Sequence, residues 1–315
     1  MTPRPPTPAA VVRILAAGNP RAPQVRELEV RPSTYSTSFA IYDVDVTFAD
    51  GSTRMLVAKQ LDRAALTDAA RAAKPEVLYD PSREPRVYET LLRRACLGTA
   101  AFYGAEDGLL LIERIDGPLL SHVGDVEVWC TVARWLGEFH ARFPSLDSGA
   151  ASAATLVRYD RPFLQLWLER ARAFAPRGAL DGIARAHDAA VELLVSAPRT
   201  LVHGEFYPSN VLIGSGRAGV RVVPVDWETA GHGPGLIDLA ALSTGWSADT
   251  AAALEEAYCK GARVPVDGPF REILRSCRLH LAVRWLGWSR TWSPPREHRS
   301  DWLGEALRVA EELGA

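Results

Sequence analysis

The sequence predicts a mixed α+β fold with two lobes, a smaller one built on an antiparallel sheet and a larger, mostly helical one. Segments with the alternation of strands gather before residue 117, whereas most of the chain after it has the apolar spacing of amphipathic helices. One polar segment, residues 201–228, lies among these later helices. We therefore expect the two lobes to cover residues 1–116 and 117–315.

Length and composition narrow the class of protein. With 315 residues and 47% hydrophobic content, the chain can bury a core in each of two lobes. The formal net charge of -2 is spread over interspersed charged residues, so we expect no contact with nucleic acid. No stretch reaches the ~18 to 20 consecutive apolar residues of a membrane span, and the proline-rich start lacks a signal-peptide pattern. We expect a cytoplasmic protein without membrane contact.

The first lobe is predicted to be a meander of strands interrupted by helices. Asp50-Gly51 is a strong signal for a hairpin turn between two of these strands. The residues 80–94 begin with turn and capping residues and continue with good helix formers. In order, we expect a helix at 9–17, strands at 24–31, 39–48 and 54–61, helices at 63–73 and 80–94, and strands at 99–103 and 108–112.

The second lobe is predicted to be helical around one polar β-hairpin. Its apolar runs lie in Leu201–Ile213 and Val222–Glu228, and its polar residues include Glu205, Asn210 and Asp226. Amide and carboxylate oxygens suit Mg²⁺ when phosphate oxygens complete the shell, so the hairpin predicts phosphoryl transfer. The expected helices are 126–143, 159–174, 180–196, 248–260, 269–289 and 301–313.

Three motifs resemble those of the aminoglycoside phosphotransferase and choline kinase-like family. They are His203-Gly-Glu-Phe-Tyr-Pro-Ser-Asn210, Val225-Asp-Trp-Glu228 and Gly235-Leu-Ile-Asp-Leu239. The resemblance runs from the loop at Ser33 to about Leu242. It implies the two-lobed protein-kinase-like fold, with ATP (or GTP) and Mg²⁺ as cofactors, and transfer of the γ-phosphate to a hydroxyl of a small molecule.

The resemblance implies a role for each position of these motifs. Glu205 takes the position of the catalytic base, which orients the attacking hydroxyl or accepts its proton. Asn210 and Asp226 take the positions of the Mg²⁺ ligands. His203 and Asp238 look like braces of the catalytic loop rather than participants in the chemistry.

The resemblance also implies the nucleotide-binding residues of the first lobe. Lys59 takes the position of the strand lysine that contacts the α- and β-phosphates, and Glu84 that of the helix glutamate that orients this lysine. The other implied contacts are the phosphate-covering loop, with Ser36, Thr37 and Ser38, and the hinge, whose backbone would pair with adenine, with Glu113, Arg114 and Ile115.

Several of these positions have a plainer interpretation. Lys59 could extend from an apolar strand to solvent. Glu84 could be an acid favoured at a helix N-terminus, and Glu89 competes for its role. Glu228 could be a third carboxylate at the metal or a hydrogen-bond acceptor behind the metal ligands.

The sequence departs from the family's pattern at two places. Glu205 stands where the family has aspartate, which moves the carboxylate by roughly one methylene, and a misplacement of about 1 Å can cost ~10²-fold in rate. The loop 33–39 has no glycine, which favours the small-molecule branch over protein kinases. A kinase of Ser or Thr in peptides and a nucleotide-binding pseudokinase remain alternatives.

The acceptor is the least determined part of the prediction. Residues 284–292 are rich in Trp and Arg, whereas a polycationic acceptor would require mainly carboxylates. Trp285 and Trp288 either pack the core of the helical lobe or form an aromatic and cationic wall for a neutral or anionic acceptor.

Overall fold

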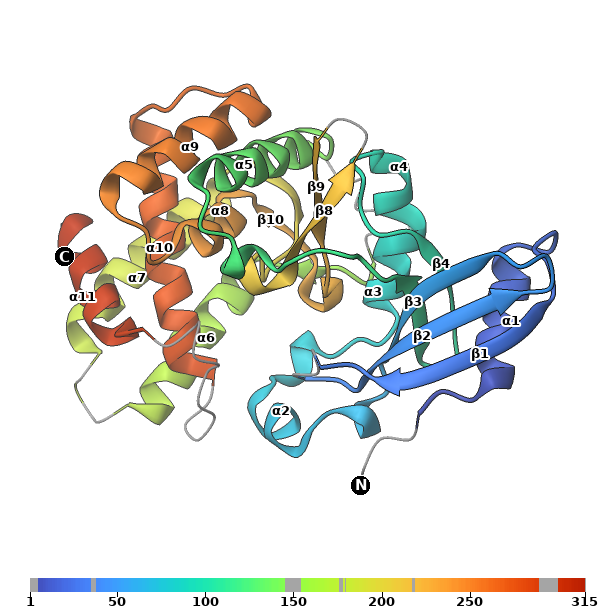
Figure 1. Ribbon diagram of the computed structural model, residues 1–315. Coiled ribbons are helices and arrows are strands. Elements are labelled where there is room, and N and C mark those ends of the chain that lie inside the picture. The colour runs from blue at the N-terminus through green and yellow to red at the C-terminus, as the bar shows by residue number, and fades with distance from the viewer. Residues whose placement is uncertain are drawn as a thin grey trace. The chain divides into compact units, whose positions relative to one another are not determined.

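The chain divides into two compact units, Met1–Asp116 and Gly117–Ala315, and each is described by itself. The computed structural model (Figure 1) describes residues 5–34, 38–144, 154–175, 178, 180–216, 219–288 and 300–314. The first unit contains an antiparallel sheet and the second is mostly helical, so the predicted α+β fold class is confirmed.

The first unit is built on a five-stranded antiparallel sheet in the order β1-β2-β3-β5-β4. Alternate residues of β2 are buried, as the alternation of apolar residues predicts. Val44 and Val46 of β2 pack with Val11 and Ile14 of helix α1, which covers this face of the sheet (Figure 1). The elements are α1 (Pro8–Gly18), β1 (Val25–Pro32), β2 (Ile41–Phe48), β3 (Thr53–Gln60), β4 (Phe102–Glu106) and β5 (Leu109–Glu113).

Strand β3 places Lys59 on the face of the sheet opposite to α1. Leu56 and Ala58 belong to the core beneath α1, and successive side chains of a strand point to opposite faces. Lys59 is paired with Ile41 of β2 and Leu110 of β5, so it lies in the middle of the sheet.

The helical segments between β3 and β4 are more broken than predicted. The expected helix 63–73 is split, because Leu66 forms a β-bridge with Phe39 and Thr67 caps a new helix by accepting a hydrogen bond from the N–H of Ala70. The expected helix 80–94 contains a π-helical stretch. The elements are η1 (Arg63–Ala65), α2 (Asp68–Ala73), η2 (Glu76–Leu78), α3 (Arg83–Arg86), the π-helical η3 (Val87–Leu92) and α4 (Arg93–Ala95).

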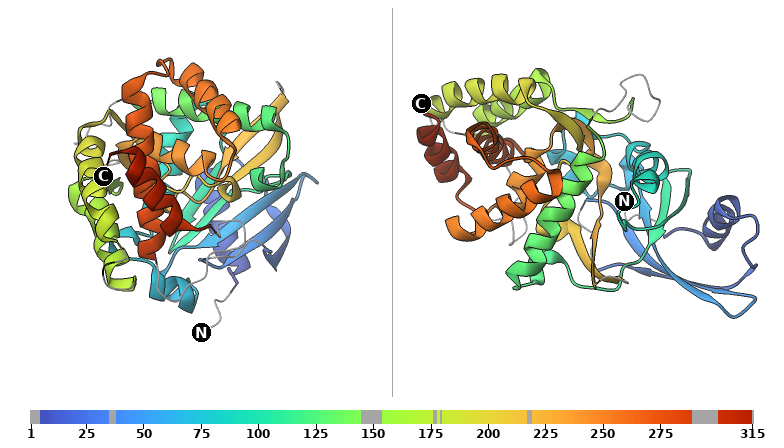
Figure 2. Two further views of the ribbon diagram at one scale, coloured as in Figure 1. Left: turned by 90° about the vertical axis from the view of Figure 1, so that its left-hand side faces the viewer. Right: turned by 90° about the horizontal axis from the view of Figure 1, so that it is seen from above.

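In the second unit, helix α10 is central to the packing. It contacts α6, α7, α8 and α11, and Figure 2 shows α11 lying beside it near the C-terminus. Helix α8 was not predicted, because its residues are buried on all sides and show little amphipathic pattern. The helices are η4 (Leu120–His122), α5 (Val126–Ala141), α6 (Arg161–Phe174), α7 (Asp181–Ser196), α8 (Leu236–Ser243), α9 (Ala248–Ala262), α10 (Gly268–Trp288) and α11 (Trp302–Glu312).

The predicted polar hairpin is partly wrong, because its first apolar run belongs to another sheet. The real hairpin is β8 (Val211–Gly216) with β9 (Gly219–Pro224). Strand β7 (Arg199–Val202) instead pairs with β10 (Gly231–Pro234), which also pairs with β6 (Val157–Arg158).

Strand β10 was missed because its sequence, Gly-His-Gly-Pro, has none of the residues that favour strands. A Cβ at Gly231 or Gly233 would come within 2.6 Å of the Tyr159 side chain, so the ring requires both glycines. Among the described residues, no helix combines the length and the apolar character needed to span a bilayer.

Candidate active site

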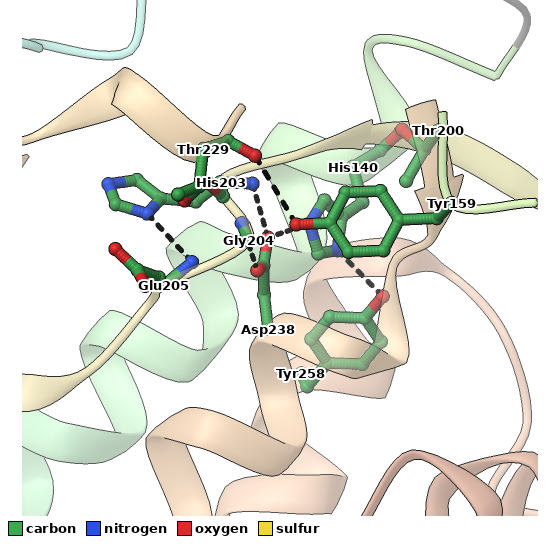
Figure 3. Close-up of polar contacts among 9 residues, drawn as sticks. All are labelled: His140, Tyr159, Thr200, His203, Gly204, Glu205, Thr229, Asp238 and Tyr258. Atoms are coloured by element: carbon green, nitrogen blue, oxygen red, sulfur yellow. Dashed lines mark hydrogen bonds and ion pairs between the residues drawn. The ribbon is translucent and has the colours of Figure 1, made fainter. Parts of the chain in front are cut away.

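The loop that follows β7 is held by a buried carboxylate from α8 (Figure 3). Asp238 is fully buried, and its two oxygens accept the N–H of His203 at 2.7 Å and the N–H of Gly204 at 2.8 Å. The Nε2 of His140 on α5 lies 3.2 Å from Oδ2 of the same carboxylate. Because a buried carboxylate requires such partners, the loop is tied to α8 and α5.

His140 connects this carboxylate to α9. Its Nδ1 lies 2.9 Å from the hydroxyl of Tyr258. Burial raises the pKa of Tyr258, so this hydroxyl stays protonated and donates to Nδ1. The other ring nitrogen, Nε2, then carries the proton that is donated to Asp238.

Gly204 is required at its position in the loop. Its φ is +83°, and a Cβ there would lie 2.1 Å from the hydroxyl oxygen of Tyr159 and 2.6 Å from the carbonyl oxygen of Thr229. That hydroxyl itself donates to the Thr229 carbonyl at 3.2 Å (Figure 3). Only glycine combines this backbone conformation with so little space.

His203 joins the loop to the end of β9. Its Nε2 donates to the carbonyl of Val225 at 2.9 Å, and its Nδ1 accepts the N–H of Glu205 at 3.3 Å. The ring also lies 4.5 Å from that of Trp227, measured between centroids. Both ring nitrogens contact the main chain, which is the arrangement of a residue that holds the loop in place.

Asn210 and Asp226 lie at the same end of the β8–β9 hairpin. Asn210 directly precedes β8, and its carbonyl accepts the N–H of Val225 at 2.9 Å. Its side-chain Nδ2 donates to the carbonyl of Glu205 at 3.0 Å. These contacts bring together the three polar positions that the sequence predicted would be close.

Asp226 has a left-handed backbone, with φ 68° and ψ 58°. Aspartate is one of the few residues other than glycine that tolerate this conformation. The turn begins the short 3-10 helix η6 (Trp227–Thr229), where Glu228 is buried.

Glu205 is bound by an arginine that lies outside the three sequence motifs. Arg284 of α10 is almost fully buried, and its Nη2 lies 2.7 Å from Oε1 of Glu205. Its Nη1 donates to the carbonyl of Gly204 at 2.5 Å. Burial is the largest single influence on the pKa of Arg284 and lowers it. The electrostatic effects of Glu205, Tyr207, Tyr159 and Asp238 together outweigh it, so the pKa lies above its ordinary value. The only signal in the sequence was an arginine within a tryptophan-rich stretch.

Trp285 and Trp288 of this stretch pack against other helices of the second unit. Trp285 stacks on Trp302 of α11, with ring centroids 5.4 Å apart, and Trp288 stacks on Trp167 of α6 at 5.6 Å. Both residues therefore pack between helices while remaining half-buried.

In the first unit, Lys59 and Glu84 form a buried ion pair. Lys59 Nζ lies 2.7 Å from Oε2 of Glu84, and the side chains are 6% and 2% exposed. The competing Glu89 is exposed. The lysine also lies 5.3 Å from the ring centroid of Phe39, at the end of the loop 33–39.

Two of the three predicted hinge residues donate their backbone N–H groups to other residues of the first unit. Glu113 donates its N–H to the carbonyl of Ala101 at 2.8 Å, and Arg114 donates its N–H to the carbonyl of Met55 at 3.1 Å. These two N–H groups are therefore already hydrogen-bonded within the first unit.

In the loop 33–39, which the sequence predicted to cover the phosphates, the carbonyl of Ser38 accepts the N–H of Thr67 at 3.0 Å. Ser36 and Thr37 lie outside the described residues.

The side chains of Asn210 and Asp226 suit a metal ion that is coordinated by the protein and by phosphate oxygens together. Within the described residues, no group of three or more His, Cys, Asp or Glu is placed to hold a metal ion. Asn210 and Asp226 supply an amide and a carboxylate, and Mg²⁺ in such sites takes its remaining ligands from phosphates and water. These two residues therefore fit Mg²⁺ that arrives with a nucleotide.

A model of the phosphotransferase enzyme family, APH, matches residues 46–273. The chain belongs to this family. It is therefore an enzyme of the phosphotransferase class, as the motifs predicted. No curated protein sequence matches the chain significantly.

Solved structures of similar fold confirm the kinase-like architecture of this APH family member. Macrolide 2'-phosphotransferase MphH from Brachybacterium faecium is 17% identical, with 96% of this chain and 97% of that chain covered and a TM-score of 0.58. A putative aminoglycoside phosphotransferase from Ralstonia eutropha is 16% identical, with coverage of 98% and 97% and a TM-score of 0.63. Choline kinase LicA from Streptococcus pneumoniae is 13% identical, with coverage of 97% and 98% and a TM-score of 0.62.

Proposed function

We propose that the protein transfers the γ-phosphate of ATP, in the presence of Mg²⁺, to a hydroxyl group of a small molecule. The observation that supports this most directly is the grouping of Glu205, Asn210 and Asp226. The side-chain Nδ2 of Asn210 donates to the Glu205 carbonyl at 3.0 Å. The backbone carbonyl of Asn210 accepts the N–H of Val225, the residue before Asp226, at 2.9 Å. Membership of the phosphotransferase family supports the same reaction class.

In this proposal, Glu205 orients the acceptor hydroxyl and accepts its proton as the oxygen attacks phosphorus. Asn210 and Asp226 would hold Mg²⁺, which when bound neutralises charge on the β- and γ-phosphates. Lys59, held by Glu84, would contact the α- and β-phosphates. Glu228 would support the metal ligands as a hydrogen-bond acceptor.

The acceptor is proposed as a small molecule because structural relatives act on such compounds. Their names specify a macrolide for one and choline for another. These relatives share only 17% and 13% identity with the chain, and we propose as acceptor a hydroxyl group of a small molecule.

The test is nucleotide turnover against a panel of acceptors. The protein is incubated with ATP or GTP and Mg²⁺, and ADP or GDP release is followed with macrolides, aminoglycosides, choline, ethanolamine, sugars and a Ser/Thr peptide mixture. We expect at least one small molecule to stimulate release, and mass spectrometry to show one added phosphate. EDTA should abolish the stimulation.

Two results would contradict the proposal. Phosphorylation of peptides alone would assign the protein to the peptide kinases. Binding of nucleotide, measured by calorimetry, without turnover for any acceptor would make it a pseudokinase.

A further inference from the structure

We propose that Arg284 is a positioning residue for the Glu205 carboxylate, and that the two form a pair matched in length. Glutamate then serves at a position where the family has aspartate because the arginine holds its longer side chain in place. This inference rests on the proposed function for the role of Glu205, and goes beyond it by assigning a residue outside the three sequence motifs.

The arginine holds the side chain and the main chain of the loop together. One guanidinium nitrogen lies 2.7 Å from Oε1 of Glu205, and another donates to the Gly204 carbonyl at 2.5 Å. The guanidinium is planar and its donors have fixed directions, so two contacts from one group fix the carboxylate relative to the backbone. A lysine in its place would offer a point charge without this geometry.

The guanidinium is itself held by aromatic rings. The Cζ of Arg284 lies 5.2 Å from the ring centroid of Trp167 and 5.7 Å from that of Trp288. These two rings are stacked nearly parallel, with an angle of 10° between their planes. Contacts at this distance attract a cation to the aromatic face, and they limit the positions that the guanidinium can take.

Helix α10, which carries Arg284, packs closely against α6 about one turn after this arginine. A Cβ at Gly287 would lie 2.5 Å from the carbonyl oxygen of Trp167, so α10 and α6 approach closely there. Arg170 of α6 donates to the carbonyls of Gly287 at 2.8 Å and Trp288 at 2.9 Å, at the end of α10. The position of Arg284 is therefore set by helix packing.

The backbone of Glu205 is also fixed, so it cannot move to suit a shorter side chain. Its N–H donates to His203 Nδ1 at 3.3 Å, and its carbonyl accepts the N–H of Tyr207 at 2.7 Å and the Nδ2 of Asn210 at 3.0 Å. Aspartate at this position would draw the carboxylate back from Arg284 by roughly one methylene. A displacement of this order can cost ~10²-fold in rate.

The experiment compares Glu205→Asp, Arg284→Lys and Arg284→Met with two controls on a second ion pair. Arg278, also on α10, lies 2.9 Å from Glu255 of α9, and both are partly buried. Glu255→Asp and Arg278→Met therefore make the same chemical changes in an ion pair away from Glu205. Turnover is measured with ATP, Mg²⁺ and an acceptor found in the panel.

We expect Glu205→Asp to lower kcat by about 10²-fold, although it restores the family's residue. Arg284→Met should lower kcat similarly with little change in the KM for ATP, and Arg284→Lys should lie between it and the wild type. The double variant Glu205→Asp/Arg284→Met should be little worse than either single variant, because the two residues act as a unit. The Glu255 and Arg278 controls should keep wild-type kcat.

A second readout needs neither nucleotide nor acceptor. In ¹⁵N-labelled protein, the guanidinium NMR signal of Arg284 should shift in Glu205→Asp and stay unchanged in Glu255→Asp. Thermal unfolding identifies any variant that fails to fold, and Arg284→Lys then replaces Arg284→Met in the comparison.

The proposal is overturned if Glu205→Asp matches or exceeds the wild-type kcat, if Arg284→Met keeps it, or if the Arg284 signal is unchanged in Glu205→Asp. A wild type that turns over with no acceptor would instead contradict the proposed function. In that case the NMR signal alone decides whether Arg284 holds Glu205.

Discussion

Lys59 on β3 and Glu84 on α3 form an ion pair with 2.7 Å between Nζ and Oε2, and both side chains are almost completely buried. The pair connects the sheet of the first unit to the helix that follows it. Because both charges are removed from water, each depends on the other to remain ionised at low energetic cost.

Removing one member of this pair should strongly destabilise the first unit. We expect Lys59→Met to lower the free energy of unfolding by about 3 to 5 kcal/mol, since it leaves the Glu84 charge buried without its partner. The double variant Lys59→Met/Glu84→Gln should recover much of this loss. Urea denaturation followed by circular dichroism measures both.

The control for this prediction is an exposed ion pair. Arg308 of α11 lies 2.7 Å from Glu305, with the arginine side chain 52% exposed. Arg308→Met should therefore cost no more than about 1 kcal/mol. If Lys59→Met and Arg308→Met lowered the free energy of unfolding equally, burial would not be the reason for the cost of losing Lys59.

Asp226→Asn should abolish most of the Mg²⁺-dependent turnover while leaving the fold intact. The amide removes the charge that the proposed metal site requires, and we expect at least a ~10²-fold loss of kcat. Asparagine tolerates the left-handed backbone at φ 68°, so the melting temperature should change little. The matched control is Asp107→Asn, another aspartate with positive φ (48°), in an exposed turn. Full activity of Asp226→Asn would rule out its assignment as a metal ligand.

Gly204→Ala should destabilise the second unit by about 2 to 5 kcal/mol, from backbone strain together with overpacking. Its Cβ would collide with Tyr159 and Thr229 at 2.1 and 2.6 Å. Gly245→Ala is the matched control, because Gly245 has a similar φ of +86° but no atom within 4 Å of the added Cβ. It should lose only the strain component, about 1 to 2 kcal/mol. Chemical denaturation of the two variants separates the cost of backbone strain from that of the steric clash. Equal losses in the free energy of unfolding would contradict the close approach of Tyr159 and Thr229 to Gly204.

Stability should fall as the pH is lowered from about 6.5 towards 4, because of two buried histidines. The rings of His187 on α7 and His280 on α10 lie 5.7 Å apart. Burial, with a smaller effect of Arg172, lowers the pKa of His187 to about 4. Burial, His187 and Arg284 lower the pKa of His280 well below its ordinary value.

The sign of this effect follows from proton binding. Between pH 4 and 6.5 the unfolded chain binds protons that the folded protein does not, so stability is complete above this window and is lost as the pH falls through it. His187 alone should contribute a loss of about 3 kcal/mol across the window. Urea denaturation at several pH values should show a shallower dependence for His187→Phe than for the wild type. The exposed His122→Phe is the control, and parallel curves for wild type and His187→Phe would contradict the prediction.

The sequence predicted the elements whose pattern is local. The alternation in β2 and the apolar stripe of α5 come from residues close together in the chain, so both elements were placed correctly. The mixed fold class and the family also followed, because the motif from His203 to Asn210 has a fixed spacing.

Features that depend on distant contacts could not be predicted. Strand β10 exists because its glycines lie against Tyr159, and the split between η1 and α2 depends on the bridge from Leu66 to Phe39. The partner of Glu205 depends on how α10 packs on α6, which no local pattern of the chain records.

The place of Arg284 in the chain affects how related sequences should be compared. The family match ends at residue 273, before this arginine. A survey restricted to the matched segment would therefore include the glutamate at the position proposed for the catalytic base, but not the arginine proposed to hold it. Aligning the helix that follows the matched segment would separate those proteins that retain both members of the pair from those that have only the glutamate.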